Sequence, residues 1–194
     1  LMAAQDEDML ALAKEKGAKG INIAGMCCTG NELLMRHGVA IAGNHLMSEL
    51  VIATGAVDML LVDYQCIMPS LGNIGSCYHT KMISTSDKAR FPNMEHHEFH
   101  PDIAADLAKK LMRAAVANFE NRGEVYIPVE PVPAIGGFSV EAVVEALGGT
   151  PAPLVDAIKA GKIRGAVGVV GCNNPKIKHD FAHINLIKEL IAKD

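Results

Sequence analysis

Apolar residues along the chain fall into two kinds of pattern, short continuous runs and helical repeats. The runs VDMLLVD at 57–63 and IRGAVGVV at 163–170 are typical of strands that are buried on both faces of a parallel sheet. With three shorter extended stretches, the pattern predicts strands at 20–24, 39–42, 57–63, 81–85 and 163–170. Apolar spacings of three and four residues predict helices at 2–16, 31–37, 44–54, 74–79, 102–121, 139–147, 153–160 and 179–193.

The predicted strands and helices alternate along the chain, which is the order of an α/β fold. We therefore expect a mainly parallel sheet with helices on both faces, giving three layers joined by right-handed crossovers. A length of 194 residues suits one domain, and we expect residues 1–194 to form a single α/β domain. The final predicted helix leaves room for a further strand after it, and the chain begins with Leu1. It is therefore expected to be a piece of a longer α/β protein.

Composition narrows the class of protein. Hydrophobic residues make up 49% of the chain and charged residues 21%, which is too apolar for intrinsic disorder. The net charge of −4 and the scarcity of aromatic residues argue against a nucleic-acid-binding surface. No apolar run approaches the roughly 20 residues that span a bilayer, and the acidic residues at 6–8 argue against a signal peptide. We expect a soluble, cytoplasmic protein without a membrane span.

Five cysteines carry the candidate chemistry: Cys27, Cys28, Cys66, Cys77 and Cys172. Three of them, Cys28, Cys66 and Cys172, each follow a predicted strand. The carboxyl ends of parallel strands share one edge of a sheet, where ligands bind, so these three side chains are expected to converge. Three thiolates at one edge indicate a soft-metal site. Zinc or an iron–sulfur cluster would require a fourth ligand, and three buried thiols at tight turns remain the alternative.

Other candidate ligands are better explained without a metal. Cys27 would point away from its neighbour in extended backbone and pack in the core, and Cys77 is expected to pack in the same way. His179 and His183 have the spacing of a zinc-binding pair but lack the glutamate of that motif. The glycines at 165, 168 and 171 have the wrong spacing for a dinucleotide site. A polar, solvated loop is expected to hold His96, His97 and His100.

Four stretches of the chain resemble the nickel-containing carbon monoxide dehydrogenases of anaerobes. They are GINIAGMCCTGNELLMRHG at 20–38, VDYQCIMPSLGNIGSCYHT at 62–80, GFSVEAVVEAL at 137–147 and IRGAVGVVGCNNPK at 163–176. The combination of CCTGNE, DYQC and GCNN is specific, and the resemblance runs in order over essentially the whole chain. It implies a Rossmann-like central domain of the catalytic subunit.

The resemblance also implies an activity and a cofactor. The family oxidises CO with water to CO₂, two protons and two electrons at a nickel–iron–sulfur cluster of the Ni-4Fe-4S type. Cys28 matches the ligand of the pendant iron, and Cys66 and Cys172 match ligands of the cubane-like irons. The remaining cluster ligands and the further 4Fe-4S clusters match positions outside 1–194, so the chain alone is expected to be inactive.

The resemblance implies partners as well. They are the remainder of the subunit, a second copy in a homodimer and a ferredoxin-like electron acceptor, with acetyl-CoA synthase as a further possibility. Two alternatives stay open from the residues alone. One is a protein similar to the hybrid-cluster proteins and hydroxylamine reductases, and the other is a metal-free Rossmann-like binding domain.

Overall fold

The computed structural model describes residues 1–63, 65, 67–130, 138–174 and 176–193. All the strands in these ranges pair in parallel, which confirms the predicted α/β class. They form two short sheets, with the order β1-β2 in one and β3-β4-β5 in the other. The strands are β1 (Ala24–Met26), β2 (Ala40–Gly43), β3 (Met59–Val62), β4 (Lys81–Ser84) and β5 (Glu95–His96).

Helices precede, connect and follow these strands. The 3₁₀ helices are η1 (His45–Met47), η2 (Asp87–Ala89), η3 (Pro101–Ile103) and η4 (Phe119–Asn121). The α-helices between residues 1 and 118 are α1 (Met2–Gln5), α2 (Glu7–Glu15), α3 (Cys27–His37), α4 (Ser48–Ala53), α5 (Ser70–Gly75) and α6 (Ala104–Asn118). The predicted helix at 2–16 is divided at Asp6, because its carboxylate accepts a hydrogen bond from Asp8 N at 3.1 Å and caps α2.

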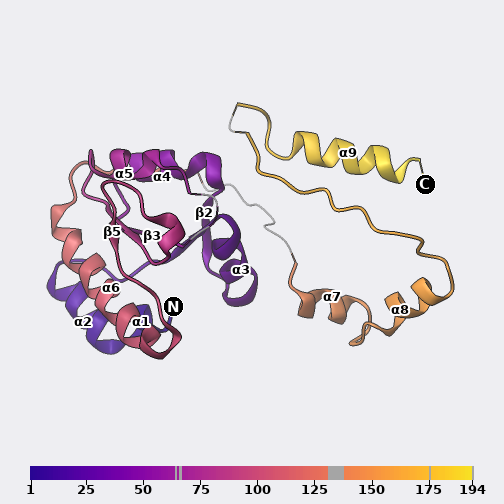
Figure 1. Ribbon diagram of the computed structural model, residues 1–194, viewed down its shortest axis with the longest axis horizontal. Helices are drawn as coiled ribbons and strands as arrows, with labels where there is room; N and C mark the ends of the chain where they lie inside the picture. Colours follow the sequence, from indigo (N-terminus) through magenta and orange to yellow (C-terminus); the bar gives the residue numbers. More distant parts are fainter. Residues whose placement is uncertain (64, 66, 131–137, 175, 194) are drawn as a thin grey trace.

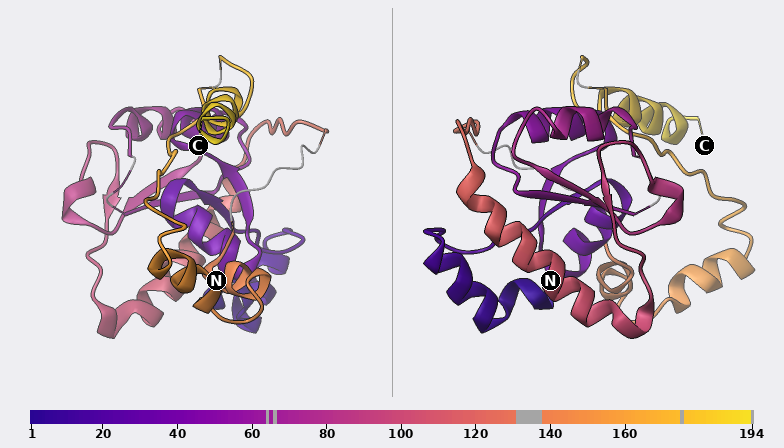
Figure 2. Two further views of the ribbon diagram at one scale, coloured as in Figure 1. Left: turned by 90° about the vertical axis from the view of Figure 1, so that its right-hand side faces the viewer. Right: turned by 60° about the vertical axis from the view of Figure 1, so that its left-hand side comes forward.

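Helices cover both faces of the β3-β4-β5 sheet (Figure 1). Helices α4 and α5 lie over one face, and α6 crosses the other with α1 and α2 packed against it, as the second view in Figure 2 also shows. Ile52 of α4, Leu71 of α5 and Met82 of β4 form the centre of the apolar core. This arrangement leaves the ends of the strands as the places where polar side chains gather.

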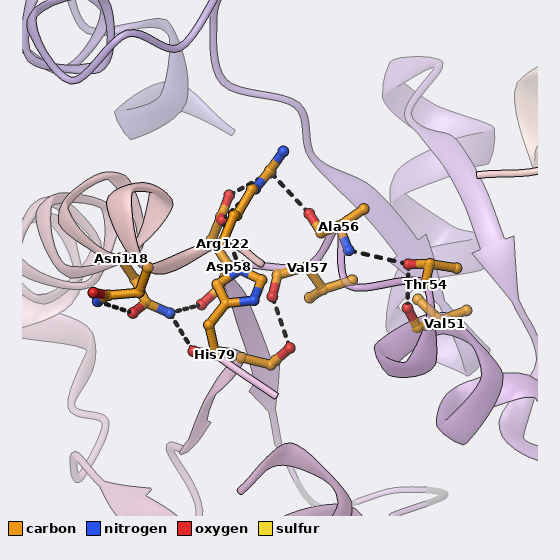
Figure 3. A network of polar contacts seen from close by, with 10 residues as sticks. Val51, Thr54, Ala56, Val57, Asp58, His79, Asn118 and Arg122 are labelled. Carbon is orange, nitrogen blue, oxygen red and sulfur yellow. Dashed lines mark hydrogen bonds and ion pairs between the residues drawn. The ribbon is translucent and has the colours of Figure 1, made fainter. Parts of the chain in front are cut away.

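A polar network joins α6 to the amino ends of β3 and β4 (Figure 3). Arg122 clamps Asp58 with two 2.7 Å hydrogen bonds and donates a third to the Ala56 carbonyl at 2.8 Å. Asn118, only 4% exposed, donates to the carbonyls of Asp58 and His79 at 2.7 and 2.5 Å. Because these carbonyls precede the strands, the network stabilises the edge of the sheet opposite the strand carboxyl ends.

The C-terminal part of the chain differs from the prediction. It contains α7 (Val140–Ala146), α8 (Ala152–Lys159) and α9 (Phe181–Ile191), but residues 163–170 form no strand. They run as an extended trace away from the sheets (Figure 1), and Val167 and Val170 are 75% and 88% exposed. A buried parallel strand needs a strand beside it, and the described residues place none there, so the predicted strand is wrong for this structure.

Burial divides the chain in the same way. Every buried residue of the described part lies between Ala3 and Asn118, and none lies in 138–174 or 176–193. Among the described residues, Arg36 of α3 bonds to Glu141 at 3.3 Å, and Asn44 after β2 bonds to the Asn173 carbonyl at 3.1 Å, which ties the C-terminal part to the rest. Among the described helices, none combines the length and the apolar character needed to cross a membrane.

Candidate functional site

The carboxyl end of β1 turns directly into α3. The sequence predicts a strand at 20–24 and a helix from residue 31, but α3 already begins at Cys27. Two features allow this abrupt junction. Cys27 adopts a left-handed backbone with φ 56°, and Gly25 and Gly30 lie so close that a Cβ atom on either would overlap the backbone of the other. Cys28 therefore sits in the first turn of α3, where the positive end of the helix dipole favours a negatively charged ligand group.

A cavity of about 150 Å³ opens between the carboxyl ends of β1 and β3. Its polar lining includes both adjacent cysteines and Asp63, while Met26 and Leu71 contribute apolar surface. The full lining comprises Met26, Cys27, Cys28, Ser48, Leu60, Leu61, Val62, Asp63, Gln65, Ile67, Leu71 and Thr85. The cavity is thus at the sheet edge that the sequence predicted for the site.

The two adjacent cysteines do not separate as expected. Cys28 is exposed and Cys27 is half-buried, yet both line the cavity. The expectation that Cys27 packs in the core assumed extended backbone, in which neighbouring side chains point to opposite faces. In the structure Cys27 has a left-handed backbone at the start of α3, so this alternation does not apply to the pair. The sequence therefore did not predict that Cys27 lines the cavity.

The structure brings Cys172 to the same general edge, although it does not test the whole predicted set. Cys172 is exposed, and the next residue, Asn173, accepts a hydrogen bond from Asn44, which follows β2. Strand β2 pairs with β1 so that Gly43 lies opposite Met26, beside the cysteine pair. Cys66 lies outside the described residues, but its neighbours Gln65 and Ile67 line the cavity.

A complete metal site is not assembled by the part of the chain that the structure describes. Within those ranges, no three His, Cys, Asp or Glu side chains group closely enough to hold a metal ion. The convergence of Cys28, Cys66 and Cys172 therefore stays a prediction. The donor chemistry suits an iron–sulfur cluster, since soft thiolates are its protein ligands, and the cavity already presents two thiols.

Some of the residues that the sequence analysis explained without a metal have different surroundings from those expected. Cys77 is exposed rather than packed, with its sulfur 3.6 Å from the Asn73 carbonyl. His96 is not in a solvated loop, because β5 pairs it with Ser84 of β4 and its Nδ1 lies 2.7 Å from the Ser84 hydroxyl. His97 is half-buried beside Glu95 at 2.9 Å, whereas His100 is exposed.

Comparison with known proteins places the chain in a family. The model of the Prismane/CO dehydrogenase family matches residues 1–194, the whole chain. The chain belongs to the Prismane/CO dehydrogenase family. This confirms the resemblance on which the predicted cysteine ligands depend.

Individual relatives in this family carry a more specific name. The chain is 58% identical to carbon monoxide dehydrogenase 1 of Methanosarcina mazei, and the match covers 100% of this chain and 31% of that relative. It is 40% identical to the beta subunit of the carbon monoxide dehydrogenase/acetyl-CoA synthase of Moorella thermoacetica, covering 96% of the chain and 29% of the relative. The chain thus spans less than a third of the length of these relatives.

A solved structure shares both sequence and fold with the chain. It is the as-isolated, nickel-free carbon monoxide dehydrogenase of Thermococcus sp. AM4, with 54% identity and a TM-score of 0.81. The match covers 98% of this chain and 30% of that one. The extended C-terminal part is therefore included in the region of similar structure.

Proposed function

We propose that this chain is the central part of the catalytic subunit of a nickel-containing carbon monoxide dehydrogenase. The subunit would oxidise CO with water to CO₂, two protons and two electrons. The observation that carries the proposal is the 58% identity over the full chain to a relative named carbon monoxide dehydrogenase. The cavity with Cys27 and Cys28 at the carboxyl edge supports it, because this is where parallel α/β sheets bind ligands.

Within this proposal, Cys28, Cys66 and Cys172 are ligands of a nickel–iron–sulfur cluster, completed by ligands outside 1–194. When bound, the cluster supplies the metal centre at which CO is oxidised and from which electrons leave. The protein would contribute thiolates from Cys28, Cys66 and Cys172, and α3 directs its amino end toward the cavity. Met26 and Leu71 contribute apolar surface to the wall of the same cavity.

The unit 1–194 would be completed by the remainder of the subunit. The exposed apolar side chains of 138–193, such as Val170 and Ile191, indicate that this part is covered in the complete protein. A homodimer, a ferredoxin-like electron acceptor and a cytoplasmic location belong to the same proposal. Association with an acetyl-CoA synthase is supported by the name of the Moorella relative.

Metal analysis and a CO assay of the full-length protein that carries this sequence test the proposal. Nickel together with iron, and CO-dependent reduction of a viologen dye, are expected. Iron without nickel would instead favour a hybrid-cluster protein, the alternative left open by the sequence. A protein purified without either metal after anaerobic expression with nickel and iron supplied would refute both metal-dependent functions.

A further inference from the structure

Asn44 uses both ends of its side-chain amide to join two distant parts of the chain. Its Oδ1 accepts a hydrogen bond from Leu46 N at 3.0 Å and so caps η1. Its Nδ2 donates to the carbonyl of Asn173 at 3.1 Å, across 129 positions of sequence. The first bond fixes Asn44 directly after β2, and the second therefore ties Asn173 to the carboxyl end of that strand.

Asn173 is held from its other side by Asp180. The Asn173 Nδ2 donates to Asp180 Oδ1 at 2.7 Å, and Asp180 N donates back to Asn173 Oδ1 at 2.6 Å. Asp180 has a left-handed backbone with φ 60° and stands immediately before α9. This reciprocal pair of hydrogen bonds ties Asn173 to the residue that precedes α9.

The two sets of bonds meet at the residue that follows Cys172. Cys172 itself is exposed, and no strand in the described ranges pairs with residues 163–170. Neither burial nor a sheet therefore orients this cysteine. In the described part of the chain, the hydrogen bonds of residues 171–173 run to Asn44 and Asp180.

We propose that Asn44 and Asp180 are positioning residues that set where Cys172 is presented at the carboxyl edge of the sheet. They act through the Asn173 backbone and side chain, as the outer hydrogen-bond partners of metal ligands orient those ligands. The inference rests on the proposed function, which makes Cys172 a cluster ligand. Neither residue touches the cluster in this proposal, so each affects metal retention only through Cys172.

The sharpest variant is Asn44→Asp in the full-length protein. An aspartate has the same shape and keeps the cap on Leu46 N, but it has no N–H to donate to Asn173. Hydrogen–deuterium exchange of residues 171–174 in the metal-free protein is expected to become faster. Iron retained against a chelator is expected to fall about 10-fold, the lower end of the effect of losing such a partner.

Two further comparisons separate positioning from a general loss of stability. Asp180→Asn keeps an oxygen acceptor and tolerates a left-handed backbone, so it should retain iron, whereas Asp180→Ala should not. Asn73→Ala is the matched control, because Asn73 is exposed and its amide makes a side-chain bond to Asn93 at 2.8 Å, away from Cys172. It should change neither exchange at 171–174 nor iron retention.

The same experiment includes Cys172→Ala, so that two kinds of failure can be told apart. If Cys172→Ala retains iron like the unmodified protein, the ligand assignment is wrong and the proposed role falls with it. If Cys172→Ala loses iron but Asn44→Asp matches the unmodified protein in iron retention, the positioning role is refuted while the ligand assignment stands. Faster exchange in β3 (Met59–Val62) of Asn44→Asp would show general unfolding and also refute the specific role.

Discussion

Gly25 and Gly30 touch backbone to backbone where β1 passes into α3. Both are buried, and a Cβ atom on either would overlap the main chain of the other rather than a flexible side chain. The contact holds the start of α3 close to the strand that precedes it. The two cysteines between these glycines reach the cavity because the junction is this tight.

Replacing Gly30 with alanine should therefore disturb the cysteine pair. The added methyl group has no space, so we expect a loss of about 1–3 kcal/mol in the free energy of unfolding, together with weaker iron binding in the full-length protein. Thermal unfolding and iron content measure the two effects. Gly20→Ala is the control, since nothing lies within 4 Å of a Cβ there. Equal stability of the two variants would contradict the close contact.

Cys28→Ala should abolish CO oxidation in the full-length protein, because the resemblance assigns the pendant iron to this thiolate. Cys27→Ala should keep substantial activity and cost about 1–2 kcal/mol of stability. Both variants are purified anaerobically and compared in CO oxidation and in nickel and iron content. Since both cysteines line the cavity, the comparison is decisive: an inactive, metal-free Cys27→Ala beside an active Cys28→Ala would reverse the assignment.

The 194-residue chain alone should show no CO-dependent reduction of a viologen dye and should hold nickel poorly. The described residues assemble no group of three ligands, and a site that lacks part of its ligands loses metal easily. The measurement is dye reduction by the purified chain under CO after reconstitution with iron, sulfide and nickel. The full-length protein treated in parallel is the positive control, and matching activity in the two would overturn the expectation.

Asn118→Ala should destabilise the fold without direct effect on the cavity. It removes the side-chain donor for the His79 carbonyl and one of two donors for the Asp58 carbonyl, which also accepts from Lys81 N at 3.0 Å. The expected cost is about 1–3 kcal/mol, measured by denaturant unfolding. Asn121→Ala is the matched control, because Asn121 is exposed and its amide donates to Asn118 Oδ1 at 3.0 Å. Its cost should be clearly smaller.

The Lys109 ammonium beside Asp6 lowers the pKa of that carboxyl, chiefly through their 2.7 Å hydrogen bond. Because the pKa of Asp6 is lower in the folded state, the ion pair adds to the free energy of unfolding at pH values above the unfolded pKa of about 4. This contribution is lost as the pH falls through the folded-state pKa. Lys109→Met should therefore raise the pKa of Asp6 in an NMR titration. Lys110→Met, which leaves the pair intact, should not. An unchanged Asp6 pKa in Lys109→Met would contradict the ion pair.

Several elements could be predicted from residues near them in the sequence. Residues 81–85 and 102–121 show clear periodicity, and β4 and α6 lie within them. The sequence predicted that residues 25–30 connect a strand to a helix. It did not predict that Cys27 would begin the helix in a left-handed conformation. A positive φ is uncommon for a residue other than glycine, so no pattern in the sequence indicated it at Cys27.

The sequence by itself determined the α/β class, the family and the three candidate cysteines, because apolar periodicity and local motifs are properties of neighbouring residues. Only the tertiary structure decided that Cys27 shares the cavity with Cys28 and that Asn44 bonds to the residue after Cys172. It also decided that residues 163–170 form no strand here, despite an apolar run suited to one. The physical reason is the same in each case: a cavity, a long-range hydrogen bond and a sheet each require a partner from elsewhere in the chain.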